Sequence, residues 1–133
     1  MAKHADVEIF VRGCEDARLL AWFEAVAGPA KVAWEREGAT GYATAKGEII
    51  VTHRMEDGPF DGIWIPWGRS RWASDVACAR EAARALGCVV RCEPGREVPG
   101  VRSDDDVLLE IEGGKERVVP GDFGPSSPPD TDG

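Results

Sequence analysis

Two stretches with helical periodicity, each set between short strand-like segments, limit the fold of this chain more than any other feature. The first covers Asp16–Ala27 and is followed by Gly28-Pro29, which ends a helix. The second begins near Ser74, a good N-cap residue, and ends at Gly87. Both stretches are amphipathic, so each helix must bury one face against another element.

The segments around the two helices predict short strands. Alternating or β-branched residues mark them at 7–11, 31–36, 42–45, 48–53, 63–65 and 88–92. Two more strands, 107–112 and 115–119, flank Gly113-Gly114, a pair typical of two-residue hairpin turns. This order favours an α+β fold with two helices packed on a mainly antiparallel sheet. We expect a ferredoxin-like βαββαβ plan with an added C-terminal β-hairpin.

Length and composition predict one domain. We expect residues 1–119 to form a single globular α+β domain and residues 120–133, rich in Pro, Ser, Asp and Gly, to be a disordered tail. No apolar run is long enough for a membrane span, and the N-terminus has no apolar signal segment. These features favour a cytoplasmic protein. The richness in Ala, Arg, Gly and Pro is typical of a GC-rich bacterial genome.

The charge is acidic overall but uneven. The formal net charge is −8, yet residues 62–102 contain seven arginines against four acidic residues. Because duplex binding requires a broad basic surface, this balance argues against nucleic acid as a partner. It suits electrostatic steering of a basic protein, although acidity also serves solubility alone.

A cluster of tryptophans and arginines is the strongest indication of a functional location. Three of the five tryptophans fall within nine residues. Trp and Arg dominate the contact energy of protein interfaces. We expect part of the cluster to plug the end of the core and part to stay exposed. The predicted partner-binding residues are Trp64, Trp67, Arg69, Arg71 and Trp72.

Two other classes of function remain open. In a small-ligand sensor or carrier, the tryptophans would wall a pocket, and Arg69, Arg71 or Arg80 would pair with an anionic group. His53 is a further candidate ligand contact. In an enzyme, His53 or Cys14 would carry the chemistry, but no nucleophile-elbow motif supports this, and no catalytic residue is predicted.

The sequence gives no indication of a metal site or a cofactor. The four cysteines, Cys14, Cys78, Cys88 and Cys92, form no CxxC pair, and the two histidines lie far from them in sequence. We expect reduced thiols that pack as small apolar groups. The acidic run at 104–106 lacks the ligand spacing of a calcium loop.

Together these features predict a non-catalytic, acidic protein-binding module. In size and charge it is analogous to immunity proteins or antitoxins that inhibit a basic toxin or enzyme, although it carries no motif of such a family. The partner is expected to be such a protein or a second copy of the chain in a homodimer.

Overall fold

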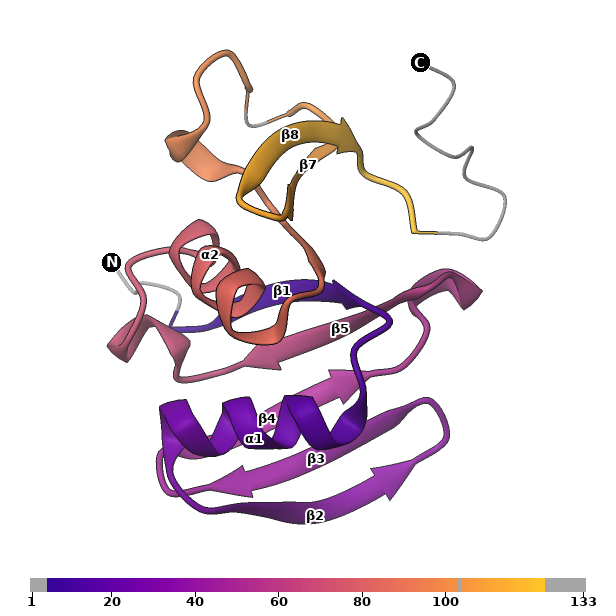
Figure 1. Cartoon of the computed structure of the whole chain (residues 1–133), viewed down its shortest axis with the longest axis vertical. Coiled ribbons are helices and arrows are strands. Elements are labelled where there is room, and N and C mark those ends of the chain that lie inside the picture. Colours follow the sequence, from indigo (N-terminus) through magenta and orange to yellow (C-terminus); the bar gives the residue numbers. More distant parts are fainter. Residues whose placement is uncertain (1–4, 103, 124–133) are drawn as a thin grey trace.

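Eight strands form one antiparallel sheet, and both helices pack on the same face of it, in a computed structural model that describes residues 5–102 and 104–123 (Figure 1). The helices are α1 (Asp16–Ala27) and α2 (Asp75–Leu86). The strands are β1 (Val7–Arg12), β2 (Ala30–Arg36), β3 (Ala39–Thr44), β4 (Gly47–Thr52), β5 (Phe60–Ile65), β6 (Val89–Cys92), β7 (Val107–Glu112) and β8 (Lys115–Pro120). Short 3-10 turns lie at η1 (Met55–Asp57), η2 (Gly68–Ser70) and η3 (Gly95–Glu97).

The predicted α+β class, with two helices on an antiparallel sheet, is confirmed within the described residues. The strand order is β2-β3-β4-β5-β1-β6-β7-β8, which is a larger sheet than a simple ferredoxin fold has. Strand β5 also starts earlier than expected. Phe60, three residues before the predicted strand 63–65, pairs with Arg12 of β1 and begins the strand.

Local sequence explains the two helices. In α2, the Ser74 hydroxyl accepts a hydrogen bond from the Ala77 amide, and Gly87 closes the helix in the left-handed region at φ 67°. Helix α1 buries Leu19, Phe23 and Val26, which lie on one stripe. Trp22 is only 5% exposed, because its ring packs 6.0 Å from that of Trp72. Among the described residues, no helix has the length and apolar character needed to cross a bilayer.

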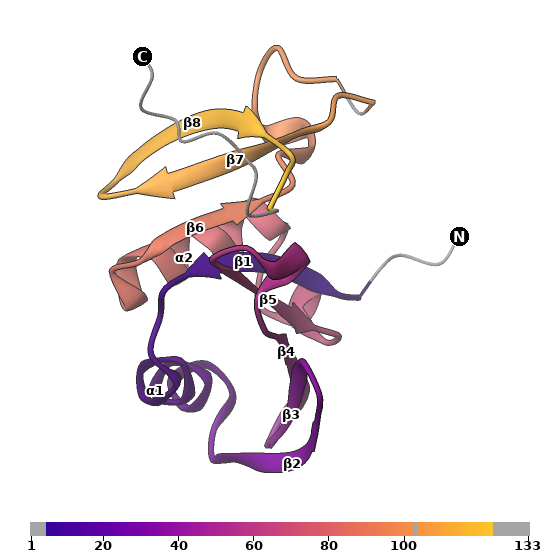
Figure 2. The ribbon, with the colours of Figure 1, turned by 90° about the vertical axis from the view of Figure 1, so that its right-hand side faces the viewer.

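The two faces of the sheet differ. On the helix face, alternate residues of β1 and β5 are fully buried beneath α1 and α2. They are Val7, Ile9, Val11, Ile63 and Ile65. Strands β2 to β4 curl around α1, as Figure 2 shows. The opposite face, which we call the open face, is the one on which neither α1 nor α2 packs.

Part of the open face is closed by a second apolar cluster. Phe10, Phe60 and Phe123 form its centre, with ring centroids 4.4 Å (Phe10 to Phe123) and 5.5 Å (Phe60 to Phe123) apart. Leu108 and Val119 complete the cluster. Three of the strands that supply it, β1, β7 and β8, lie in the same half of the sheet as β6.

The start of the expected tail takes part in this cluster. Pro120 is the last residue of β8, and Phe123 is only 7% exposed. The Phe123 amide donates a hydrogen bond to Glu56 Oε1 of η1, which fixes the chain across the open face. The rest of the segment for which disorder is predicted, residues 124–133, lies outside the described residues.

A charged network borders the same cluster. Glu110 is 3% exposed and accepts hydrogen bonds from Arg91 at 2.7 Å and Arg117 at 2.7 Å. Burial raises the pKa of the Glu110 carboxyl, but the hydrogen bonds from Arg117 and Arg91 outweigh it and hold the pKa below its ordinary value. The Arg91 guanidinium also lies 4.4 Å from the centroid of Phe60. This half of the open face is therefore built as core.

Candidate functional site

The structure divides the predicted tryptophan and arginine cluster between the two faces of the sheet. Trp72 is 4% exposed and packs in the core on the helix face. Its indole donates to Glu81 Oε1 at 3.1 Å, and its ring stacks with that of Trp67 at 6.3 Å. Trp64 lies on the opposite, open face, because alternation along β5 separates it from the buried Ile63 and Ile65.

Each of the two loop arginines has its own partners. Arg71 forms an ion pair with Glu81 at 3.0 Å and lies over the Trp72 ring. Arg69 donates to the Ala73 carbonyl oxygen at 2.8 Å and to the backbone oxygen of Asp6 at 3.3 Å. Arg69 therefore lies near Trp64, which also contacts Asp6, whereas Arg71, Trp67 and Trp72 belong to the other face.

Arg80, a candidate for anion binding, is also engaged. Its guanidinium donates two hydrogen bonds to Glu116, at 2.8 and 3.0 Å, and lies 3.8 Å from Glu97. A paired guanidinium offers an incoming anion less charge and fewer free donors.

A row of side chains crosses the open face over five strands. The pairing register places Trp34 beside Gly41, Gly41 beside Ile50, Ile50 beside Trp64, and Trp64 beside Glu8. We call these five residues the open-face row. Trp34, Ile50 and Trp64 are its apolar members. Sequence reasoning missed Trp34 and Ile50 because only the strand order reveals that they share a row with Trp64.

The ring of Trp34 covers β3. A methyl group placed on Gly41 would lie 2.2 Å from this indole, so the glycine leaves the space that the ring fills. The Trp34 indole donates to Glu48 Oε2 at 2.6 Å, and Arg36 lies 5.1 Å from the ring centroid. These contacts hold Trp34 flat against the sheet and half-buried.

Trp64 is the exposed apolar member of the row. It is 39% exposed, and its indole donates to Asp6 Oδ2 at 3.0 Å. Among the described residues, the other large apolar side chains with comparable exposure are Val32 and Val118, on the outermost strands β2 and β8. Trp64 is thus the one large exposed apolar side chain of the described residues that lies in the interior of the sheet.

Acidic groups gather at the β1 end of the row. The pKa of Glu8 is raised by burial and by the charges of Asp75, Asp6 and Glu93. The pKa of Asp75 is raised by burial, and by Asp6 and Glu93, against the opposing effects of the Glu8 amide and Arg69. Asp75 Oδ1 accepts a hydrogen bond from the Glu8 amide at 3.4 Å, which ties the start of α2 to β1.

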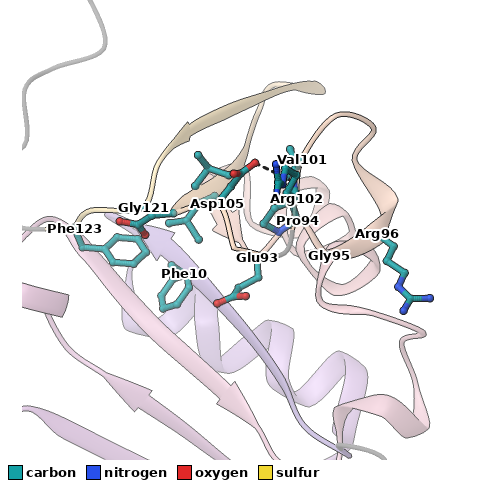
Figure 3. A pocket seen from close by; sticks show the side chains of 13 residues that line it. Phe10, Glu93, Pro94, Gly95, Arg96, Val101, Arg102, Asp105, Gly121 and Phe123 are labelled. Atoms are coloured by element: carbon teal, nitrogen blue, oxygen red, sulfur yellow. Dashed lines mark hydrogen bonds between the residues drawn. The ribbon is translucent and has the colours of Figure 1, made fainter.

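A cavity of about 380 Å³ opens beside this acidic end (Figure 3). Phe10 and Glu93 line it on one side, and Arg96, Arg102 and Asp105 line it on the other. None of the tryptophans or arginines predicted as ligand contacts lines it. The cavity therefore differs from the pocket expected for an anionic ligand. Its lining carries both positive and negative charges, and the residues predicted to contact such a ligand lie elsewhere.

The two candidate catalytic residues, His53 and Cys14, both interact with other side chains of the fold. His53 Nε2 lies 3.0 Å from Thr40 Oγ1. Burial, and next a hydrogen bond with Cys88, raise the pKa of the Cys14 thiol to about 12. Reactive thiols have lowered pKa values, so this shift is opposite to the one that a nucleophile needs.

The remaining thiols and acids give no metal centre in the part of the chain that is described. Burial raises the pKa of Cys92 to about 12 and also raises that of Cys78. Within residues 5–102 and 104–123, no group of three or more His, Cys, Asp or Glu side chains is placed to hold a metal ion.

Comparisons with protein families, with curated proteins and with solved structures gave no match for this chain.

Proposed function

We propose that the protein is a non-catalytic binding module that contacts a partner protein through the part of its open face that carries the open-face row. Because no other apolar cluster of the described residues covers this part, we call it the uncovered half. The observation that carries this proposal is the exposure of Trp64 in the interior of a sheet whose other half is closed by apolar packing. A Trp side chain held in place by neighbouring contacts is a typical anchor of a protein interface.

The shape of the surface favours a protein over a small molecule. Small-ligand sites are concave and mostly apolar, whereas the open-face row lies on a sheet surface. Arg69, Arg71 and Arg80, which would serve an anionic ligand, already have carboxylate or carbonyl partners. The raised thiol pKa values give no support to a nucleophilic enzyme.

The acidic character favours a basic partner. The net charge is −8, and four carboxylates lie near the β1 end of the row. We propose a cytoplasmic bacterial protein that binds and inhibits a basic toxin or enzyme, as immunity proteins do. This finer proposal rests on the analogy of size and charge.

We also propose that the four central strands keep the ferredoxin-like plan expected from the sequence. The support is their order, β6-β1-β5-β4, with α1 following β1 and α2 connecting β5 to β6. The β2–β3 and β7–β8 hairpins then extend this plan at its two edges.

Affinity capture with matched baits tests the binding function. The baits are the wild-type chain, Trp64→Ala, and Val118→Ala as the control, because Val118 is also an exposed apolar residue but lies on β8. We expect one host protein to bind the wild type and Val118→Ala and to be lost with Trp64→Ala. If no host protein depends on Trp64, or if both variants lose it equally, the proposal fails. An immunity role further requires that equimolar protein inhibits the activity of the captured partner.

A further inference from the structure

We infer that the partner docks an extended segment along the open-face row. Two apolar side chains of this segment contact the row's apolar members, Trp34, Ile50 and Trp64, and a Lys or Arg side chain contacts Glu8. This inference rests on the proposed function and names the chemistry of the partner. It requires an apolar residue, a second apolar residue two positions later, and a cation two positions after that.

The spacing of the row matches this pattern. Because the Trp34 ring lies over β3, the contact positions run from β3 across β4 and β5 to Glu8 on β1. Neighbouring strands are about 4.8 Å apart, so this distance is roughly 14 Å. An extended chain advances about 3.4 Å per residue, and alternate side chains point the same way, so side chains four positions apart also span roughly 14 Å. Such a segment would cross the strands at a steep angle, as in orthogonal sheet packing.

The β1 end of the row fits a cation. Glu8 lies beside Trp64 in the register, so one guanidinium or ammonium group can reach both the carboxylate and the indole face. Asp6, Asp75 and Glu93 add negative charge there. Arg69 lies 3.9 Å from Asp75 and offsets part of this charge, but its hydrogen bonds go to the backbone oxygens of Asp6 and Ala73. A cation from the partner would relieve this repulsion, which favours a basic segment over an acidic one.

The β2 end of the row sets the direction of the segment. Arg36 lies over the Trp34 ring, and the Glu48 carboxylate at that end already accepts the hydrogen bond of the Trp34 indole. A second cation there would therefore meet a like charge beside a carboxylate that is already engaged. A segment with its cation at the wrong end would therefore place two positive charges together and leave the Glu8 end unpaired. The row should discriminate between a segment and its reversed sequence.

Four peptide probes test this pattern on the full chain. The first carries valine, leucine and arginine at alternate positions between serine and glycine residues. The second replaces the arginine with citrulline, its neutral isostere, and the third reverses the sequence of the first. The fourth replaces the arginine with glutamate. Nitrogen-15 NMR of the chain reports binding through the indole N–H signals of Trp34 and Trp64 and the amides of Ile50 and Glu8.

We expect the arginine peptide to shift these signals and the other three to bind at least about fivefold more weakly. Glu8→Gln should reduce the affinity for the arginine peptide to that for the citrulline peptide. Glu112→Gln is the control, because it removes the same charge from an exposed residue of β7. Higher salt should weaken the binding of the first peptide more than that of the citrulline peptide.

Three results would overturn the inference. If the arginine and citrulline peptides bind the row equally, the surface docks proteins but does not select a cation. If no peptide shifts the row at millimolar concentration, the extended-segment pattern is wrong. If sedimentation shows a dimer that Trp64→Ala dissociates, the occupant is a second copy. In the first two cases the proposed function can still hold, since it fails only when partner capture does not depend on Trp64.

Discussion

The two halves of the open face carry similar apolar side chains but differ in what covers them. In the covered half, the rings of Phe10, Phe60 and Phe123 pack together, and Glu110 is paired with two arginines. In the uncovered half, which carries the open-face row, the indole of Trp64 is 39% exposed. The covered half depends on Phe123, just after β8, whose ring packs on those of Phe10 and Phe60.

Glu110 in the covered half and Glu8 in the uncovered half also differ, in the direction in which their surroundings shift the carboxyl pKa. The pKa of Glu110 is lowered, because hydrogen bonds from Arg117 and Arg91 outweigh its burial. The pKa of Glu8 is raised by burial and by neighbouring acids. The charge on Glu110 thus stabilises the fold, whereas the charge on Glu8 is held at a cost that a cationic partner would remove. We therefore assign one half to stability and propose that the other serves contact.

Removing Phe60 should have the largest effect on stability. Phe60 is 2% exposed and packs on Phe123 and Arg91. Phe60→Ala should lower the free energy of unfolding by about 3–5 kcal/mol. Trp64→Ala should lower it by less than about 1 kcal/mol, since surface substitutions have small effects. Urea denaturation of both variants measures the difference, and equal losses would remove the distinction between the two halves.

Neutralising Glu110 should have the second-largest effect on stability. Glu110→Gln removes the buried carboxylate that pairs with the half-buried Arg91, which should cost about 3 kcal/mol at pH 7. Because the folded pKa is lower than the unfolded value of about 4.3, the stabilisation is complete above that value and is lost as pH falls through the folded pKa. Denaturation at several pH values should therefore show the gap between wild type and variant narrowing below pH ~4.3. A gap that does not change with pH would contradict this account.

Adding a methyl group to the row should have an intermediate effect. In Gly41→Ala the new methyl group would collide with the Trp34 indole, which must then leave β3 and its hydrogen bond to Glu48. We expect the free energy of unfolding to fall by about 1–3 kcal/mol. The Trp34 indole N–H signal should shift strongly and that of Trp67 should not. An unchanged Trp34 signal would show that the ring does not lie over Gly41.

Neutralising Glu8 should have the smallest effect and the opposite sign. Its folded pKa is raised, so the ionised form is disfavoured and the cost is greatest above that pKa. Glu8→Gln should leave stability unchanged or raise it by up to about 0.5 kcal/mol at pH 7, in contrast to Glu110→Gln. Thermal denaturation at pH 7 compares the two. A clear loss of stability in Glu8→Gln would contradict the assignment of this carboxylate to the contact half.

The sequence predicted the local structure better than the site. Capping residues and periodicity placed α1 and α2, and Gly113-Gly114 placed the last hairpin, because these signals act over a few residues. The open-face row depends on pairing between residues far apart in sequence, such as Trp34 with Gly41 and Ile50 with Trp64, which no local pattern specifies. The close spacing of Trp64 and Trp72 in sequence was misleading for the same reason, since strand alternation and the following loop send them to opposite faces.

Hydrogen–deuterium exchange of the complex with the captured partner tests the central claim most directly. If the uncovered half of the open face is the contact surface, peptides that contain Trp34, Ile50 and Trp64 should exchange more slowly in the complex. Peptides from β7 and β8 should not change, because the apolar cluster already covers that half. Protection confined to residues 67–72 or to the exposed surfaces of α1 and α2 would contradict the account.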